Sequence, residues 1–348
     1  MTMLPGVRVT GRGIGAATAA QALAARGVGV TADPDCGPAP RQAPLVMLGD
    51  QAQALLCDVF AGNPLLAAAL NAAHPIARRI VRWGDAPAQI FPHSARVIGG
   101  DTLGEAVWSP PPPWAGDPRF VLTTTPPGGA TMLRFGAREA AAAPVVLGDA
   151  ADCHAAYVES LGAGWLFLIP TGARTGWLLA VGADPADALA DSTVIAPVVA
   201  ETGAIAARFE TAPRLLDDPG APGLLTLGSA ALAFDPICGD GTATATRGGL
   251  LAAAVAAALL GADAPMVDPA VDGAALAMHY RLMLIAAMRR HLATSWPFYA
   301  RGGAGPWWQA EAEALANGHA WCTRQLGAAG EARFVLAGDR LIHRESAA

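Results

Sequence analysis

The chain has 348 residues, of which 53% are apolar and only 15% are charged, and its net charge is −6 at pH 7. All 23 basic side chains are arginine, because the sequence contains no lysine. This excludes a Schiff-base lysine, a lysine general base and a P-loop lysine. The acidic balance also argues against a nucleic-acid-binding protein. The length fits one large or two small domains.

Cysteine usage and the apolar runs set further limits. The five cysteines are widely spaced and form no CxxC pair, so neither a metal site nor a disulfide framework is expected. The N-terminus lacks the basic and apolar regions of a signal peptide. The longest apolar run, residues 248–262, is short for a membrane span. These patterns predict a cytoplasmic protein with reduced thiols and no integral membrane segment.

The predicted elements begin with a βαβ unit: a strand over 7–10, a glycine turn, a helix ending near Arg26 and a second strand over 28–32. Residues 33–43 are predicted as a loop, and the prolines at 110–113 as a crossing between layers. The remaining predictions are helices over 51–60 and 65–82, paired strands over 88–99, strands over 120–135, 144–147, 164–170 and 176–181, helices over 185–189 and 193–210, a strand over 224–227, helices over 248–260, 273–295 and 307–325, and a strand over 333–336.

The glycine turn carries a dinucleotide-binding fingerprint of the GxGxxG/A type. Gly11 allows the tight turn, Gly13 lets the backbone approach a pyrophosphate, and Ala16 permits close packing of the helix on the strand. Ile14 and Gly15 open the helix, whose N-terminus would face the phosphates. The turn is therefore predicted to bind a dinucleotide.

The same fingerprint expects an acidic residue at the end of the second strand, to bind a ribose hydroxyl. Asp33 or Asp35 fits this role. A rival interpretation is the TGxxxGIG turn of short-chain dehydrogenases, but those enzymes use a Tyr-xxx-Lys pair. The missing lysine excludes that chemistry, although tyrosines are present at positions 157, 280 and 299.

A second motif lies far downstream, where residues 227–242 read LGSAALAFDPICGDGT. This run resembles the C-terminal flavin motif of FAD-dependent monooxygenases of the para-hydroxybenzoate hydroxylase type, GDAAH…DPxxGxGxNxA. It is most similar to the branch with tryptophan halogenases, geranylgeranyl reductases and flavoproteins of tryptophylquinone biogenesis, which often read GDAALAFDPLSGQG. The order of the two motifs along the chain also agrees with that family.

The resemblance implies FAD as the cofactor. In the family an aspartate binds the ribityl chain where this sequence has Ser229, and the Pro-x-x-Gly-x-Gly backbone lies along the isoalloxazine, with the next helix pointing at its N1–C2=O edge. The family's middle DG motif survives at most near Gly148 and Asp149. The cofactor contacts that the resemblance implies are Gly228, Ser229, Asp235, Pro236, Gly239, Gly241 and Thr242, together with Arg41 near the phosphates.

Residues 164–170, GWLFLIP, resemble the GWxWxIP strand beside the flavin in halogenases. Trp165 and Phe167 are therefore predicted to line the substrate pocket. The aromatic residues around 297–299 and 306–308 are also similar to the C-terminal helices of this branch.

The residues limit the chemistry that a flavin could perform here. Halogenation in this family needs a lysine, so it is not expected. Hydroxylation through a flavin C4a-hydroperoxide needs reduced FAD, oxygen, a dry pocket and an aromatic substrate, and it benefits from a base. His93, His154 and Asp240 are the candidate bases, and Cys238 is a candidate thiol near the flavin ring.

The predicted fold is α/β: a Rossmann-like FAD-binding domain (1–85 and 215–265), an inserted antiparallel-sheet substrate domain (86–214) and a helical C-terminal segment (266–348). The predicted function is an FAD-dependent monooxygenase acting on an aromatic or indole substrate, such as a peptidyl tryptophan. Electrons would come from NAD(P)H or a separate flavin reductase. The alternatives are a reductase of the geranylgeranyl reductase type and a degenerate, non-catalytic maturation partner.

Overall fold

The computed structural model describes residues 6–36, 44–108, 114–262, 267–330 and 332–344. One sheet is mainly parallel and runs in the order β15-β16-β6-β1-β2. Its strands are β1 (Gly6–Thr10), β2 (Val30–Asp33), β6 (Pro118–Thr123), β15 (Gly220–Ala221) and β16 (Leu224–Thr226). Parallel neighbours need crossover connections, and helix α1 (Ile14–Ala25) makes the first of them between β1 and β2. The predicted N-terminal βαβ unit is confirmed.

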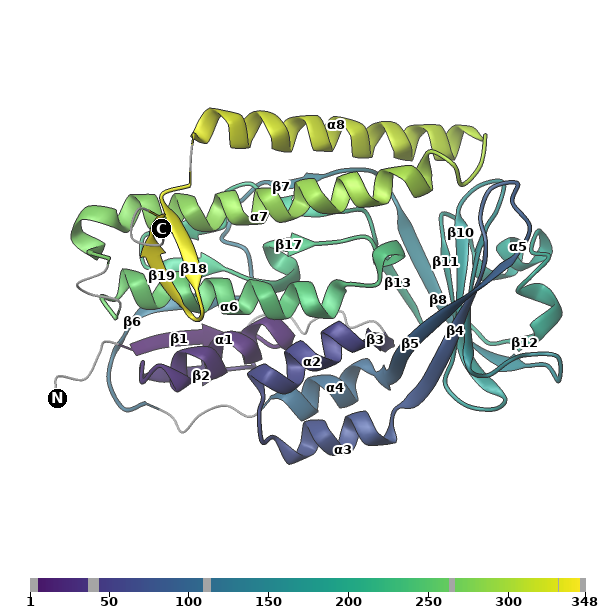
Figure 1. The fold of residues 1–348 in the computed structure, drawn as a ribbon, viewed down its shortest axis with the longest axis horizontal. Coiled ribbons are helices and arrows are strands. Elements are labelled where there is room, and N and C mark those ends of the chain that lie inside the picture. The colour runs from purple at the N-terminus through teal and green to yellow at the C-terminus, as the bar shows by residue number, and fades with distance from the viewer. Residues whose placement is uncertain (1–5, 37–43, 109–113, 263–266, 331, 345–348) are drawn as a thin grey trace.

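A larger sheet of nine strands is mostly antiparallel, in the order β12-β8-β11-β10-β9-β4-β5-β3, with β13 also paired to β8. It forms the opposite end of the molecule from the parallel sheet (Figure 1). Its strands are β3 (Leu45–Gly49), β4 (His74–Arg82), β5 (Gln89–Gly99), β8 (Glu139–Leu147), β9 (Ala155–Ser160), β10 (Trp165–Pro170), β11 (Thr175–Val181), β12 (Val199–Thr202) and β13 (Ala207–Glu210).

Two small sheets and the helices complete the fold. The small sheets pair β7 (Met132–Arg134), β14 (Arg214–Leu216) and β17 (Leu232–Ala233), and β18 (Phe334–Ala337) with β19 (Arg340–His343). The other helices are α2 (Asp50–Val59), α3 (Pro64–Ala72), α4 (Gly100–Val107), α5 (Pro185–Ala190), α6 (Gly241–Leu259), α7 (Pro269–Tyr299) and α8 (Pro306–Ala329), with 3-10 turns η1 (Ala196–Val198), η2 (Gly228–Ala230) and η3 (Pro236–Cys238). The helices α1, α6, α7 and α8 pack in succession, and α7 and α8 extend towards the large sheet (Figure 1).

Two predicted helices are wrong over much of their length. The helix predicted over 65–82 ends at Ala72, and β4 begins at His74. The residue before a proline avoids the helical region, so Pro75 ends the helix. Ile76, Ile80 and Val81 then favour a strand.

The helix predicted over 193–210 is replaced by η1, β12 and β13. The buried carboxylate of Glu159 accepts hydrogen bonds from the backbone N–H groups of Thr193, Val194 and Ile195 at 2.9–3.2 Å. These bonds, and one from the Ser192 hydroxyl, outweigh desolvation and lower the pKa of Glu159. A side chain from β9 thus holds this segment in an irregular turn, which local sequence patterns do not reveal.

Smaller differences follow from turns. In the region 88–99, residues 89–99 form one strand, β5, paired with β4 and β3, rather than two strands paired with each other. Residues 120–135 contain two strands, β6 and β7, separated by a turn around Pro126 and Pro127. The strand predicted over 333–336 is one arm of the β18–β19 hairpin.

The chain passes back and forth between the two large sheets. Strands β3 and β4, before residue 85, lie in the antiparallel sheet, whereas β6, after it, lies in the parallel sheet beside β1. The mixed α/β fold class is confirmed. The limits at 85, 214 and 265 stay a prediction about domains.

Helix α6 is the one helix in the described ranges with the length and hydropathy of a membrane span. Of its most apolar stretch, 61% is buried inside the fold. It lies between α1 and α7 (Figure 1). The approach to α1 is close, because a Cβ at Gly249 would lie 2.5 Å from the Gly15 carbonyl oxygen and 2.8 Å from Thr18 Cβ. A residue without a side chain therefore sets the spacing of these helices.

We expect Gly249→Ala to destabilise the protein by about 1–3 kcal/mol, because the added methyl group forces α1 and α6 apart. Gly248→Ala is the matched control, since nothing lies within 4 Å of its added Cβ. At position 248, alanine should leave the free energy of unfolding unchanged or raise it by up to about 1 kcal/mol, because alanine has a higher helix propensity than glycine. Urea unfolding of both variants measures the difference, and equal free energies of unfolding would contradict the packing argument.

Candidate functional site

The turn between β1 and α1 has the geometry that its glycines predict. Gly11 has a φ of 85°, and a Cβ there would lie 1.8 Å from Thr124 Oγ1. Gly13 is the N-cap of α1 with a φ of 121°, and nothing lies within 4 Å of its Cβ position. The first turn, with Ile14, Gly15 and Ala16, has no side-chain cap, so its N–H groups are available to a ligand.

Asp33 is the last residue of β2 and lies beside the turn, since the Gly11 N–H donates to its carbonyl oxygen at 2.9 Å. Asp35 is exposed and pairs with Arg12 at 2.7 Å. This leaves Asp33 as the acidic side chain at the strand end. Arg41, the predicted phosphate contact, lies outside the described residues.

The second motif forms a loop that ends at the N-terminus of α6. Gly228 has a φ of 68° and starts η2, and the exposed Ser229 follows it. Pro236 opens η3, where Asp235 Oδ1 accepts the Ile237 N–H at 2.8 Å, and Gly239 then turns the chain with a φ of 63°. Gly241 and Thr242 begin α6.

The two predicted motifs meet in space. The Cβ position of Gly15 is 3.4 Å from Gly228 Cα and 3.3 Å from the Ala245 carbonyl oxygen. Cβ atoms at Gly228 and Gly241, as at Gly13, would have nothing within 4 Å. The helix starts of α1 and α6 both lack side-chain caps. Glycine turns open to free space beside uncapped helix starts fit an extended ligand with phosphates at α1 and an electron-rich ring at α6.

Beneath the loop lies a buried polar network centred on Arg138. Its Nε is 2.8 Å from Asp235 Oδ2, its Nη1 pairs with Glu311, and its guanidinium lies 4.3 Å from the ring centre of Tyr299. The Tyr299 hydroxyl donates to Asp235 Oδ2 at 2.6 Å and accepts from Trp165 Nε1 at 3.2 Å. The network therefore joins the loop, the large sheet and both C-terminal helices.

Burial dominates the pKa of two members of this network, Asp235 and Tyr299, whereas the partners of Arg138 outweigh burial and raise the pKa of Arg138. Burial raises the pKa of Asp235, against Arg138, Tyr299 and the Ile237 N–H. Burial, together with Asp235, also raises the pKa of Tyr299 well above its usual range. Tyr299 is therefore a protonated hydrogen-bond donor.

His291 of α7 supports the same loop. Its Nε2 accepts the Asp235 N–H at 3.0 Å, and its ring stacks on Phe234 with centroids 4.1 Å apart. Burial and the charge of Arg138 lower the pKa of His291 to about 3. The ring is neutral at pH 7, with its proton on Nδ1.

The candidate catalytic residues of the loop differ in setting. Burial raises the pKa of Cys238 to about 11, so its thiol, 3.8 Å from Ser295 Oγ, is protonated at neutral pH. Asp240 is half exposed and pairs with Arg247 at 3.0 Å. The loop thus presents neither a thiolate nor a free carboxylate.

His93, on β5, faces this loop across Arg79 of β4. Arg79 Nη2 lies 3.4 Å from the Cβ position of Gly239. Burial and the charge of Arg79 lower the pKa of His93, against Asp50, and its buried Nε2 has no hydrogen-bond partner among the described residues. The other candidate base, His154, instead binds the Pro75 carbonyl and stacks on His74.

Trp165 and Phe167 are 1% and 8% exposed and face the main core from β10. Trp165 takes part in the Arg138 network, and its role as a pocket wall stays a prediction. The residues that sequence reasoning missed are Arg79, Arg138, His291, Tyr299 and Glu311. The aromatic tail at 297–299 was the one signal pointing to any of them.

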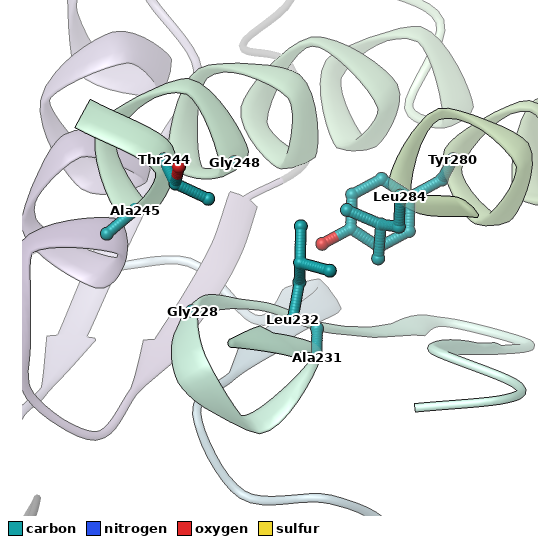
Figure 2. A pocket seen from close by; sticks show the side chains of 8 residues that line it. All are labelled: Gly228, Ala231, Leu232, Thr244, Ala245, Gly248, Tyr280 and Leu284. Carbon is teal, nitrogen blue, oxygen red and sulfur yellow. The ribbon is translucent and has the colours of Figure 1, made fainter. Parts of the chain in front are cut away.

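A small hollow lies behind the loop, between η2, α6 and α7 (Figure 2). Tyr280 and Leu284 point into it from α7, and Leu232 faces them. Its lining is mainly apolar, and the Tyr280 hydroxyl is already bound to the Thr226 carbonyl at 2.8 Å. The hydroxyl group of Thr244, which also lines the hollow, donates to Asp240 Oδ2 at 3.5 Å, so both hydroxyl groups are bound within the protein and the hollow is a packing gap.

The sequence matches no protein-family model and no curated protein. Solved structures match its fold over most of the chain. The peptidyl tryptophan dihydroxylase QhpG, essential for tryptophylquinone cofactor biogenesis, is 18% identical with a TM-score of 0.64, over 88% of this chain and 78% of QhpG. The flavin-dependent halogenase CmlS is 14% identical with a TM-score of 0.69, over 92% of this chain and 71% of CmlS.

The myxobacterial chondrochloren halogenase CndH, a variant of FAD-dependent halogenases, is 16% identical with a TM-score of 0.65, over 93% of this chain and 90% of CndH. The predicted resemblance to the halogenase-like branch is confirmed at the level of the fold. The cofactor predicted from the sequence, FAD, is the one named for CndH. By their names, CmlS and CndH are flavin-dependent halogenases and QhpG is a dihydroxylase.

We expect acid to destabilise the protein through His291. Because its folded pKa of about 3 lies below the usual 6.5, the unfolded chain binds the extra proton between these values, so stability falls as pH drops below about 6.5. The slope is about 1.4 kcal/mol per pH unit. His291→Gln keeps an acceptor for the Asp235 N–H without titrating, and urea unfolding at pH 5 and 7 should show a correspondingly weaker pH dependence.

His319→Gln, on α8, is the control and should keep the wild-type slope. An unchanged slope in His291→Gln would show that this histidine does not bind the extra proton on unfolding.

Proposed function

We propose that the chain binds FAD and is a flavin-dependent monooxygenase that hydroxylates an aromatic or indole substrate. The observation that carries this proposal is the meeting of two open glycine turns at the uncapped N-termini of α1 and α6. The fold shared with a peptidyl tryptophan dihydroxylase supports it. A tryptophan within a peptide is the substrate class that we favour.

Different residues would bind different parts of the cofactor. The turn at Gly11 and Gly13 would hold the pyrophosphate, and Asp33 the ribose. Ser229 would meet the ribityl chain, and the loop from Pro236 to Gly241 would lie along the ring. Bound and reduced, FAD supplies the electrons that activate oxygen.

The chain's own contribution is to position the ring and exclude water. The Arg138 network fixes Asp235, and Asp235 fixes the turn of η3 that would lie along the ring. The apolar residues of β10 and the protonated Cys238 keep the nearby interior dry. Halogenation is outside this proposal, because no lysine is present.

The electron donor would be NAD(P)H in a transient encounter, or a separate flavin reductase, because the sequence has no second nucleotide fingerprint. A cytoplasmic location is part of the same proposal. A reductase acting on an apolar substrate, and a fold kept only as a maturation partner, are the outcomes that the experiments below separate from it.

We expect purified protein, alone or after addition of FAD, to show saturable FAD binding by absorbance near 450 nm. Gly13→Asp should abolish binding, because it places a carboxylate where the phosphates would lie and strains a φ of 121°. Gly129→Asp is the matched control, as it also has positive φ and open space and lies in an exposed turn. Its FAD affinity should equal that of the wild type.

Absence of saturable FAD binding in the wild type would contradict the proposal. A non-catalytic maturation partner would then be the remaining interpretation. With FAD bound, oxygen uptake that depends on substrate and yields a hydroxylated product supports the monooxygenase. Substrate reduction without oxygen uptake would show a reductase instead.

We expect Ser229→Asp to tighten FAD binding roughly tenfold or more. The side chain is exposed at the start of η2, so a carboxylate there can accept a charge-assisted hydrogen bond worth about 1.5–3 kcal/mol. Fluorescence titration of FAD into wild type and variant measures the change. The control is Thr202→Asp, at an exposed position of β12, where the affinity should stay constant. An equal or weaker affinity in Ser229→Asp would place the ribityl chain elsewhere.

A further inference from the structure

Arg79 occupies an unusual position for a cation. It lies on β4 between β5 and β9, paired in register with Phe91 and Ala156. Ala156 belongs to the main core with Phe167 and Ile169 of β10, so Arg79 points to that apolar face of the sheet. Its neighbour Ile80 points to the other face and packs on the second core.

No acid in the part of the chain that the structure describes pairs with this charge. Among the described residues Arg79 makes no hydrogen bond or ion pair, and its buried Nε has no partner. On the opposite face of the same strand, Arg78 pairs with Asp152 and Arg82 with Glu159. Arginine cannot shed its proton in a protein, so this half-buried charge is permanent and costs stability until an anion meets it.

The surroundings of Arg79 supply further donors and an apolar wall. His93, two residues from Phe91 on the same face, has a buried Nε2 without a partner. Phe91 is 46% exposed although it lies on this face. On the side of the loop that leads from Gly228 to the start of α6, Arg79 Nη2 approaches the backbone at Gly239. A guanidinium, an imidazole and an exposed aromatic ring therefore converge next to the loop.

We propose that Arg79 and His93 bind the carboxylate of an aromatic substrate, with the aromatic part against Phe91 and the loop at Gly239. The guanidinium presents two parallel N–H donors to a carboxylate, and the imidazole can donate a third. This rests on the proposed function, which it deepens by giving the substrate a carboxylate. In a peptide substrate the α-carboxyl group of an internal tryptophan is an amide, so the carboxylate bound here belongs to the peptide C-terminus or to a neighbouring Asp or Glu side chain. Cys238 and Asp240, neither of which is a free anion facing Arg79, leave that position to the ligand.

The test compares indole-3-acetate with indole-3-acetamide, which match in shape and differ in charge. Calorimetric titration of the FAD-loaded wild type should show the carboxylate binding about tenfold tighter or more. In Arg79→Gln the ratio of the two affinities should fall to about one. Arg79→Lys restores the charge and should recover most of the preference, and Arg78→Gln, one residue away on the other face, should keep it in full.

Stability gives a second readout. Removing an uncompensated cation should leave the thermal midpoint of Arg79→Met equal to or above that of the wild type. A clear drop in that midpoint would mean that Arg79 holds the fold together, and would overturn the proposal.

Other outcomes also overturn it. A wild type without preference for the carboxylate, or an Arg79→Gln variant that keeps the preference, removes Arg79 from anion binding. If Arg79→Gln weakens FAD binding and leaves the preference intact, the arginine serves the cofactor. If the wild type binds no FAD, the proposed function fails, and the same titration of the FAD-free protein still decides whether the carboxylate site exists.

Discussion

The ion pairs of Arg138 with Asp235 and Glu311 hold the molecule's separate parts in one arrangement. Arg138 lies just before β8, Asp235 in the loop before α6, and Glu311 in α8, and both the arginine and Asp235 side chains are fully buried. A buried charge left without its partner typically costs about 3–5 kcal/mol. Each part is therefore fixed by the other two. Gly136 shows how tight the site is, because a Cβ there would lie 2.3 Å from Glu311 Oε2.

The consequence reaches the candidate site through Asp235. One of its oxygens serves the network, and the other caps η3 at the Ile237 N–H. Its backbone N–H is held by His291, so the peptide and the side chain are both fixed. Residues 235–237 of the loop are thus held in place by the protein itself, as a site that must orient a planar ring requires. The stabilisation that the network provides therefore fixes the geometry of the loop more than it strengthens the binding of a ligand.

Local features of the site could be predicted from the sequence, and long-range ones could not. The turns at Gly13 and Gly228 have backbone angles that glycine adopts most readily, so the positions of these glycines in the sequence predict the turns. Arg138 and Glu311, by contrast, are 173 residues apart and resemble any surface pair in the sequence. The segment after Ser192 is predicted as a helix but forms an irregular turn for the same reason, since its N–H groups are bound by Glu159 from a distant strand. The geometry of the turns is determined by neighbouring residues in the sequence, whereas the network forms only when folding brings distant residues together.

Because the sequence contains no lysine, the two cations most important to the candidate site, Arg138 and Arg79, are both arginines. Arginine forms forked hydrogen bonds with carboxylates and keeps its charge when buried, which suits Arg138 between two acids. It also lacks the nucleophilic amine of lysine, so Arg79 beside the loop can hold a group but cannot carry one covalently. Both arginines are permanent cations in apolar surroundings, yet within the described ranges Arg138 pairs with two acids and Arg79 with none. The fold therefore neutralises the charge of Arg138 itself, and in our proposal a ligand neutralises the charge of Arg79 next to the loop at Gly239.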